Sequence, residues 1–272
     1  DGTTTGSPDP VDDSDLPSAA VGVFAGGHHT CAILDTGGVM CWGWNEYGQL
    51  GDGTTSNRPT PGDVSGLLSG VAAVSLGSQH TCALLDTGGI KCWGFNWFGQ
   101  VGDGSNENNR LSPVDVAGLS ADVERVLTGW RHTCAIVAGG GIKCWGLNDN
   151  GQLGDGGTTD ASAPVDVAGL SSGVAAAAAG NGHTCAVLEA GGILCWGNNE
   201  EGQLGDGTTN DSPVPVVVMD PPADAAAIGA GIQHNCVLQA GGEVHCWGWN
   251  FYGQLGNNST GDSTSPVAVH CQ

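Results

Sequence analysis

Residues 77–104 read GSQHTCALLDTGGIKCWGFNWFGQVGDG, and four further stretches of the chain follow the same plan. Each stretch places two cysteines ten positions apart, and successive stretches recur every 51 or 52 residues. A fixed period of this length is typical of supersecondary units stacked in a ring or a solenoid. We therefore interpret what the five copies share as scaffold, and what differs between them as the place of a specific function.

The composition favours an all-β protein that is rich in tight turns. Glycine accounts for 49 of 272 residues, only 12% of the residues are charged, and bulky strand formers occur in short runs. Each copy contains about four such runs separated by turn signals, which is the sequence form of a propeller blade. Five copies of one unit also favour a single array over two separate domains.

The charge balance excludes several classes of partner. The net charge is −22, from 28 acidic residues against six basic ones. Nucleic acids and anionic membrane surfaces are bound through lysine and arginine, so we expect neither as a partner. No stretch of about 18 apolar residues occurs, so we expect no membrane insertion. The chain begins at Asp1 without methionine, and with its cysteine usage this suggests an exported protein whose leader was removed.

The repeated cysteines are predicted to form disulfides inside β-hairpins. If Asp35, Thr36 and Gly37 form a three-residue loop, Cys31 faces Cys41 across two antiparallel strands. Zinc ligands are usually spaced two to four residues apart, and a nucleophilic thiol is not repeated five times, so both alternatives fit less well. Disulfides imply an oxidising compartment, extracellular or at the cell surface. The predicted pairs are Cys31–Cys41, Cys82–Cys92, Cys134–Cys144, Cys185–Cys195 and Cys236–Cys246.

The sequence thus predicts an all-β fold: a β-propeller of five repeats of about 51 residues, each a four-stranded blade with a cross-strand disulfide. Residues 20–272 would form the propeller, and residues 1–19 a Thr/Pro/Asp-rich tail or linker. Cys271 has no counterpart in any repeat. It could be a free thiol, an intermolecular link or the trace of a longer parent.

The repeated motifs carry a family resemblance. The pattern W-G-x-N-x-x-G-Q-L-G-D-G and the preceding G-x-x-H-T-C-A-L resemble repeats of the regulator of chromosome condensation family, here in a bacterial-type, secreted, cysteine-stapled form. The resemblance covers residues 20–270 and implies a β-propeller, commonly of seven blades. Five copies leave either a five-bladed ring or a piece of a larger one. We expect a closed ring, in which the strand Pro266–Val269 pairs the two ends of the chain.

Two repeated polar positions have both a structural and a metal-binding interpretation. A histidine stands two residues before the first cysteine of each copy, and we expect hydrogen bonds within or between blades in preference to a metal or anion site. The G-Q-L-G-D-G loops carry aspartates that could bind calcium, but backbone capping explains them equally well. We predict no metal and no cofactor. The positions are His29, His80, His132, His183 and His234, and Asp52, Asp103, Asp155 and Asp206, with Asn257 in the last copy.

The loops between Trp-Gly and Gly-Gln differ most between the copies. They are aromatic in copies one, two and five, and acidic or polar in copies three and four. In a closed ring copies five, one and two are neighbours, so the aromatic loops would build one continuous patch, a typical binding surface. At the loop tips the counterparts of the aromatics are acidic or amide residues, so these aromatics should be exposed. The predicted binding residues are Trp44, Tyr47, Phe95, Trp97, Phe98, Trp249, Phe251 and Tyr252.

No catalytic residue set stands out beyond the repeats, so we do not expect an enzyme. The nucleotide-exchange role of nuclear family members is not transferred, because they need basic extensions and this chain is acidic. The first functional hypothesis is a non-catalytic extracellular interaction propeller that binds a protein or a glycan through its aromatic loop face. The alternative is a self-assembling structural subunit of an extracellular fibre or surface layer, which binds copies of itself.

Overall fold

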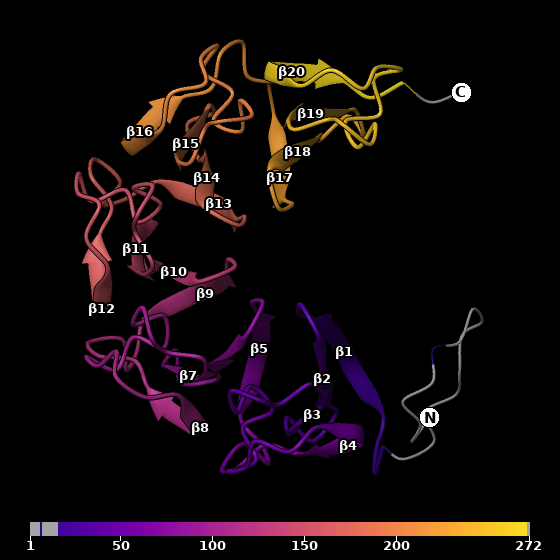
Figure 1. The fold of residues 1–272 in the computed structure, drawn as a ribbon, viewed down its shortest axis with the longest axis vertical. Helices are drawn as coiled ribbons and strands as arrows, with labels where there is room; N and C mark the ends of the chain where they lie inside the picture. Colours follow the sequence, from indigo (N-terminus) through magenta and orange to yellow (C-terminus); the bar gives the residue numbers. More distant parts are fainter. Residues whose placement is uncertain (1–5, 7–15, 271–272) are drawn as a thin grey trace.

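The computed structural model describes residue 6 and residues 16–270. The regular elements in this part of the chain are strands, grouped into five antiparallel sheets of four (Figure 1). We number the sheets as blades 1 to 5. Blades 1 and 2 consist of β1 (Ala20–Ala25), β2 (His29–Leu34), β3 (Val39–Gly43), β4 (Arg58–Asp63), β5 (Val71–Leu76), β6 (His80–Leu85), β7 (Ile90–Gly94) and β8 (Arg110–Asp115). Blades 3 to 5 consist of β9 (Val123–Thr128), β10 (His132–Val137), β11 (Gly141–Gly146), β12 (Ala161–Asp166), β13 (Val174–Ala179), β14 (His183–Leu188), β15 (Ile193–Gly197), β16 (Ser212–Val217), β17 (Ala225–Ala230), β18 (His234–Gln239), β19 (Val244–Gly248) and β20 (Ser263–Ala268).

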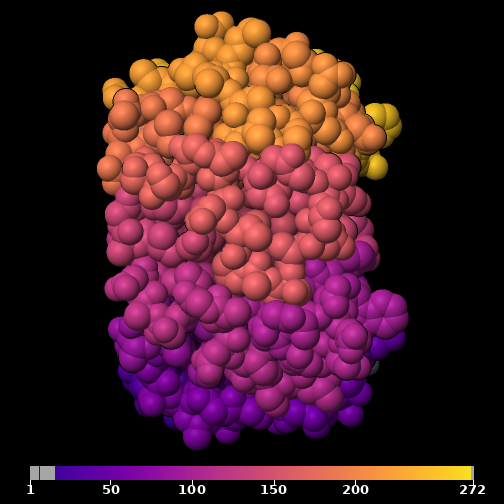
Figure 2. All heavy atoms as spheres, turned by 90° about the vertical axis from the view of Figure 1, so that its left-hand side faces the viewer, coloured from indigo at the N-terminus to yellow at the C-terminus, as the bar shows by residue number. Residues whose placement is uncertain are grey.

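The blades are arranged around a centre in chain order. Figure 1 shows β1, β5, β9, β13 and β17 nearest the centre and the fourth strand of each blade at the outer rim. Seen from the edge, consecutive blades lie against one another without interleaving (Figure 2). The predicted fold class, a propeller of five four-stranded blades, is confirmed.

Each blade contains the predicted disulfide-bonded hairpin. Cys31 pairs with Cys41 in the register of β2 and β3, and the other four pairs are equivalent. All five pairs form disulfides, with Cα atoms 4.0 or 4.1 Å apart. The three-residue loop ends at Gly37, whose φ of 76° lies in the left-handed region that glycine adopts without strain. The sequence spacing therefore predicted both the turn and the cross-link.

The hydrophobic core lies between the blades. At the junction of blades 2 and 3, Leu84 and Ile90 pack with the disulfide of blade 2 against Ala135 and Trp145 of blade 3. Trp145 is fully buried there. We call the side of each blade that carries its disulfide the trailing face, and the opposite side, with the tryptophan of C-W-G, the leading face. At each of the four junctions between consecutive blades, the trailing face of one blade packs against the leading face of the next.

A repeated hydrogen-bond set joins each blade to the next, and we call it the inter-blade clamp. The Thr133 hydroxyl donates to the Gln100 carbonyl oxygen at 2.8 Å, and Trp145 Nε1 donates to the same oxygen at 2.9 Å. Because the hydroxyl proton is used there, the Thr133 oxygen accepts from His80 Nε2 at 2.9 Å. Equivalent clamps involve His29 with Thr81, His132 with Thr184, and His183 with Asn235. At these four histidines the prediction of hydrogen bonds between blades is confirmed.

The predicted closure of the ring is wrong. The strand expected at Pro266–Val269 is part of β20, which pairs with β19 inside blade 5. Blade 1 already has its own outer strand, β4, so it leaves no position for a strand from the other end. Consecutive blades pack through their inner strands, whereas β17 and β1 form no comparable contact. The five blades form an open arc whose ends are blades 5 and 1 (Figure 1).

Two predictions fall outside the described residues. The predicted tail, residues 1–19, lies mostly outside them, as does Cys271, so both stay predictions. The described residues form no helix that is long and apolar enough to cross a bilayer.

The clamp histidines are neutral because they are buried. Burial lowers the pKa of His29 and His183 to about 4 and that of His80 and His132 to about 3. Neighbouring histidines lower these pKa values further, and for His183 a hydrogen bond with Asn235 acts in the opposite direction. The Nδ1 atoms of these four rings have no hydrogen-bond partner among the described residues. The neutral form with hydrogen on Nε2 therefore suits the folded protein.

This burial predicts a protein that is destabilised by acid. The folded pKa values lie below the ordinary value of 6.5, so the unfolded chain binds more protons once the pH falls below 6.5. The contribution to stability is complete above pH 6.5 and is lost as the pH falls toward 4. At pH 5 each clamp histidine should lower the free energy of unfolding by about 2 kcal/mol. Urea unfolding at pH 8 and pH 5, with the disulfides intact, measures the change.

The variant His132→Gln is the matched control for this acid effect, because it keeps an N–H donor toward Thr184 but does not titrate. It should lose about 2 kcal/mol of the pH-dependent change, the contribution expected of one clamp histidine. A wild-type stability that stays constant between pH 8 and pH 5 would contradict the assignment.

The disulfides predict a second effect on stability. The variant Cys134→Ala/Cys144→Ala removes one short covalent loop and should lower the free energy of unfolding by about 3 kcal/mol on the chain-entropy model. Chemical denaturation under oxidising conditions measures the loss. Reductant should then affect the variant less than the wild type, because one fewer cross-link remains to be broken.

Candidate functional site

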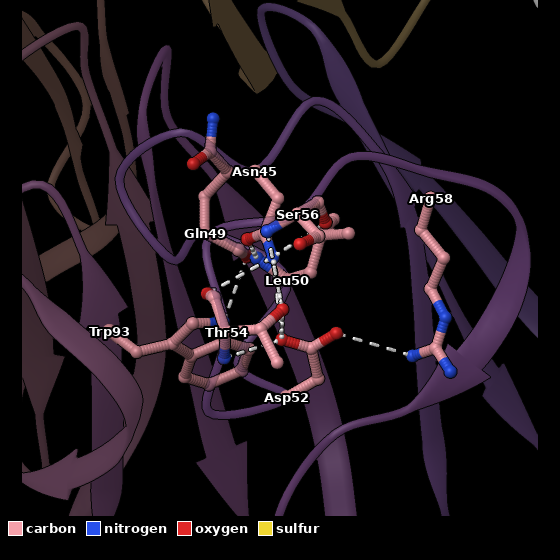
Figure 3. Close-up of polar contacts among 8 residues, drawn as sticks. All are labelled: Asn45, Gln49, Leu50, Asp52, Thr54, Ser56, Arg58 and Trp93. Carbon is pink, nitrogen blue, oxygen red and sulfur yellow. Dashed lines mark hydrogen bonds and ion pairs between the residues drawn. The ribbon is translucent and has the colours of Figure 1, made fainter.

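The variable loop of each blade is fixed at its base by one buried asparagine. Asn45 is fully buried, and its Oδ1 accepts a hydrogen bond from the Leu50 amide at 2.9 Å. Its Nδ2 donates to the carbonyl oxygens of Thr54 and Ser56, both at 3.1 Å (Figure 3). One side chain thus closes both sides of the loop. The equivalent residues Asn96, Asn148, Asn199 and Asn250 are also fully buried and accept from the amide five positions on.

The aspartates of the G-Q-L-G-D-G loops cap the backbone. Asp52 Oδ1 accepts from the Thr54 amide at 2.9 Å and from the Thr54 hydroxyl at 2.8 Å, and Asp52 Oδ2 lies 3.5 Å from Arg58 Nη1 (Figure 3). Partial burial acts to raise the pKa of Asp52, but the hydrogen bonds from Thr54 and Asn45 and the charge of Arg58 outweigh it and lower the pKa. Among residues 16–270, no cluster of three or more metal-ligating side chains has the geometry of a metal site.

The first loop-tip position is exposed in every blade. Trp97 is 65% exposed and Phe251 is 65% exposed, and their counterparts Glu46, Asp149 and Glu200 are exposed as well. The position-by-position prediction of exposure is therefore confirmed here. At the second position it is only partly right.

The second loop-tip position depends on the blade that follows. Tyr47 and Phe98 are half-buried, because each loop packs on the outer strand of the next blade, as the contact of Gly48 with Leu111 shows. Tyr252 is 78% exposed, since no blade follows blade 5 among the described residues.

The aromatic side chains of blades 1 and 2 form one connected surface, which we call the aromatic arc (Trp44, Tyr47, Phe95, Trp97 and Phe98). The ring of Tyr47 lies 5.2 Å from Trp44 and 4.9 Å from Phe95, in both cases edge to face. Phe95 continues to Trp97 at 6.3 Å and to Phe98 at 5.9 Å. Aromatic ring pairs in edge-to-face or offset arrangements contribute stability beyond that expected from their buried area. The aromatic arc therefore continues without a break from blade 1 to blade 2.

Sequence reasoning missed two residues that extend the aromatic arc into blade 3. The Arg131 guanidinium lies over the rings of Phe98 at 5.2 Å, Phe95 at 5.8 Å and Trp130 at 4.5 Å, all cation–π contacts. Trp130 is 41% exposed. Both residues occupy the middle of the G-x-x-H turn, which also varies between the copies. Comparing the five copies at this turn, as at the loop tips, identifies Trp130 and Arg131.

The aromatic side chains of blade 5 form a separate group. Trp249 contacts Tyr252 at 5.3 Å and Phe251 at 6.3 Å, but no ring contact joins this group to the aromatic arc among the described residues. The prediction of one continuous patch across blades 5, 1 and 2 is wrong for the described structure, because it required a closed ring. The eight predicted residues lie instead in two groups near the two ends of the open arc.

Blades 3 to 5 present an acidic surface beside the aromatic arc. Asp149 and Glu200 are exposed at the rim of a cavity of ≈ 280 Å³ that Trp130 and Arg131 also line. Burial, together with the charges of Asp262 and Glu200, raises the pKa of Glu201, as expected where carboxylates crowd together. A second cavity of ≈ 580 Å³ lies at the centre, lined by the inner turns of all five blades. Trp130 borders both cavities.

Five four-stranded blades, each with a hairpin disulfide and a variable loop fixed by a buried asparagine, define a repeat β-propeller. The chain matches the family model WD40_RLD, described as the RCC1-like domain, over residues 2–272. It belongs to this family, which confirms the resemblance drawn from the W-G-x-N and G-x-x-H motifs.

Known proteins similar to this chain agree with the family. It is 32% identical over 256 residues to the ultraviolet-B receptor UVR8 of Arabidopsis thaliana, covering 92% of this chain and 58% of UVR8. It is 29% identical over 254 residues to the human E3 ubiquitin-protein ligase HERC2, covering 92% of this chain but 5% of HERC2. The chain therefore spans little more than half of the first relative and a small part of the second.

Two solved structures share the fold. The crystal structure of human WBSCR16 superposes with a TM-score of 0.80 at 26% identity, covering 93% of this chain and 67% of that one. The crystal structure of Prp20p from Saccharomyces cerevisiae superposes with a TM-score of 0.79 at 19% identity, covering 93% of this chain and 63% of that one. The second likeness concerns the fold alone.

The loop base gives a stability prediction. The variant Asn148→Ala leaves the Leu153 amide and the carbonyl oxygens of Gly157 and Thr159 without their partner. Because unpaired buried groups cost about 1–3 kcal/mol each, we expect a loss of roughly 3–5 kcal/mol in the free energy of unfolding. The exposed neighbour Thr158, changed to Ala, is the matched control and should leave urea unfolding nearly unchanged. Equal unfolding midpoints for the two variants would contradict the role of Asn148.

Proposed function

We propose that this protein is a non-catalytic extracellular interaction propeller that binds another protein through the aromatic arc and its extension at Trp130 and Arg131. The observation that supports this most is a connected, partly exposed aromatic surface on loops that a buried asparagine fixes at their base. Aromatic and arginine side chains in such a setting are the residues that carry most of the binding energy at protein interfaces.

The aromatic side chains on these loops should lose little conformational entropy when a partner binds. The buried asparagine under each loop and the edge-to-face ring contacts fix the side chains before any partner arrives. Ordering side chains on binding costs about 0.5–1.5 kcal/mol each, so a preformed surface keeps more of its contact energy. Trp97 is the natural anchor, because it is the exposed tryptophan of the aromatic arc and stacks on Phe95.

The charges suggest the chemistry of the partner. The exposed carboxylate Asp149 lies at the rim of the cavity that Trp130 and Arg131 line, and the whole chain carries a net charge of −22. A partner surface with an apolar centre and basic residues at its rim would be complementary and would associate faster at low salt. A protein surface fits the extent of the site, which reaches across three blades, better than a single sugar ring.

The relatives support binding as the family role. UVR8 is a receptor by name, and Prp20p is described as binding Gsp1p and histones. The partners of those proteins are not transferred to this chain. The extracellular location rests on the five hairpin disulfides, since such bonds persist in oxidising compartments.

A photo-crosslinking pair tests the proposal. A photoreactive phenylalanine is placed at position 97 in one variant and at position 200, the same loop-tip position of blade 4, in another. We expect a protein partner to be crosslinked from position 97 and not from position 200. With that partner purified, Trp97→Ala should weaken binding at least about tenfold in a calorimetric titration, while Glu200→Ala should retain affinity within a few-fold.

Other results would contradict the proposal. Crosslinking from both positions alike would show that the aromatic arc is not the site. Binding to a glycan array that is lost in Trp97→Ala, without a protein crosslink, would assign the surface to a carbohydrate. Trp97 is largely exposed, so its removal should not unfold the chain, and thermal melting of each variant checks this.

A further inference from the structure

The loops of blades 3 and 4 enclose a polar cavity at the positions that build the aromatic arc in blades 1 and 2. At the junction of blades 1 and 2, the rings of Tyr47 and Phe95 lie 4.9 Å apart. The equivalent positions at the junction of blades 3 and 4 are Asn150 and Asn198, which both line the cavity of ≈ 280 Å³. Because an amide side chain is smaller than an aromatic ring, the space that the two rings fill at the first junction is open at this one.

The cavity brings both signs of charge together. Arg131 lines it, together with the carboxylates of Asp149 and Glu200. Arg131 forms no ion pair with a carboxylate among the described residues, and its Nε atom is buried there without a hydrogen-bond partner. One oxygen of Asp149 accepts a hydrogen bond from Gln152 Nε2 at 3.1 Å, which holds that carboxylate in place.

These charges favour a ligand that itself carries both signs. A simple cation is repelled by Arg131, and a simple anion is repelled by Asp149 and Glu200. A carboxylate can accept two parallel hydrogen bonds from one guanidinium, and an ammonium group is stabilised by carboxylates and by the face of an indole ring. An α-amino acid carries a carboxylate and an ammonium group on the same carbon, so it satisfies both parts of the cavity.

One wall of the cavity is largely apolar. Trp130, Asn181 and Ile232 line both this cavity and the central cavity of ≈ 580 Å³. Trp130 is 41% exposed and Ile232 is 65% exposed, so both offer apolar surface to a ligand. The inner strands add Ala179 and Ala230 to the lining of the central cavity. A ligand in the polar cavity therefore gains from an apolar side chain directed toward this wall.

We propose that the polar cavity is a binding site for a free α-amino acid with an apolar side chain. The α-carboxylate binds the Arg131 guanidinium, and the α-ammonium group faces Asp149 and Glu200. The side chain covers Trp130 and Ile232. Pockets for drug-sized ligands occupy about 300–1,000 Å³, so a cavity of ≈ 280 Å³ suits a smaller molecule of this kind. This site does not depend on the partner proposed for the aromatic arc.

Calorimetric titration of the chain of residues 1–272 tests the proposal, with L-leucine and L-phenylalanine as probes. We expect saturable binding that weakens at least about tenfold when the probe lacks one of the recognised groups. Leucinamide lacks the carboxylate, 4-methylpentanoate lacks the ammonium group, and glycine lacks the side chain.

Variants of the cavity test each contact. In Arg131→Gln, L-leucine should bind about as weakly as leucinamide, because its carboxylate has lost its partner. Asp149→Asn with Glu200→Gln should weaken L-leucine binding at least about tenfold. Asn150→Tyr with Asn198→Phe introduces the ring pair of the first junction, so it should fill the cavity and abolish binding.

Glu46→Gln is the matched control for the loss of a carboxylate. Glu46 occupies in blade 1 the exposed loop-tip position of Glu200, but it does not line the cavity. This variant should keep the affinity for L-leucine within about twofold. Thermal melting of each variant shows whether it is folded, and the charge variants keep the test valid if the ring pair prevents folding.

Several results would overturn the proposal. One is the absence of saturable binding of L-leucine and L-phenylalanine at concentrations up to about 10 mM. Another is equal affinity of the wild type for L-leucine and leucinamide, which leaves Arg131 without a role. Binding of a neutral hexose in place of either amino acid, lost when the cavity is filled, would assign the cavity to a carbohydrate. Crosslinking from position 97 tests the aromatic arc alone, so either proposal can fail while the other holds.

Discussion

At each of the four junctions between described blades, one backbone carbonyl oxygen determines how the two blades assemble. The Gln100 oxygen receives the Thr133 hydroxyl and the Trp145 indole from the next blade, and it does so beside a fully buried ring. Buried donors and acceptors that lose their partners destabilise a protein strongly, so this geometry fixes the angle between blades. The same glutamine accepts the Phe98 amide through its side-chain Oε1 at 3.1 Å. The blade junction and the variable loop are therefore positioned by a single residue.

This coupling explains why the surface can vary while the scaffold stays constant. The asparagine and glutamine that fix the loop are present in all five blades, but the loop tips range from Trp97 to Glu200. Because the first loop-tip side chain is exposed in every blade, its identity can change without loss of the fold. Family membership accounts for the shared residues, whereas the aromatic arc and its acidic neighbour come from the positions that differ between the blades.

Most of the fold could be predicted from local patterns in the sequence. The ten-residue cysteine spacing and the glycine at the end of each turn determined the hairpin, its register and the disulfide, since all three are properties of adjacent residues. The role of the histidines also followed from their repetition. The gap between blades 5 and 1 could not be predicted, because it depends on whether two faces that are far apart in the sequence contact each other. The place of Trp130 in the aromatic surface could not be predicted from the W-G-x-N loops, because Trp130 lies in the G-x-x-H turn of the following blade and only the packing of blades brings the two segments together.

Among the residues that the structure describes, the disulfides are confined to single hairpins and none joins one blade to another. Each cysteine therefore finds its partner as soon as its own turn has formed, before any neighbouring blade exists. Mispairing among ten equivalent thiols is limited by proximity, because the correct partner is always the nearest along the chain. A gene encoding such a protein can gain or lose whole repeats by duplication and deletion without disturbing the remaining disulfides. Blade number can thus evolve independently of oxidative folding.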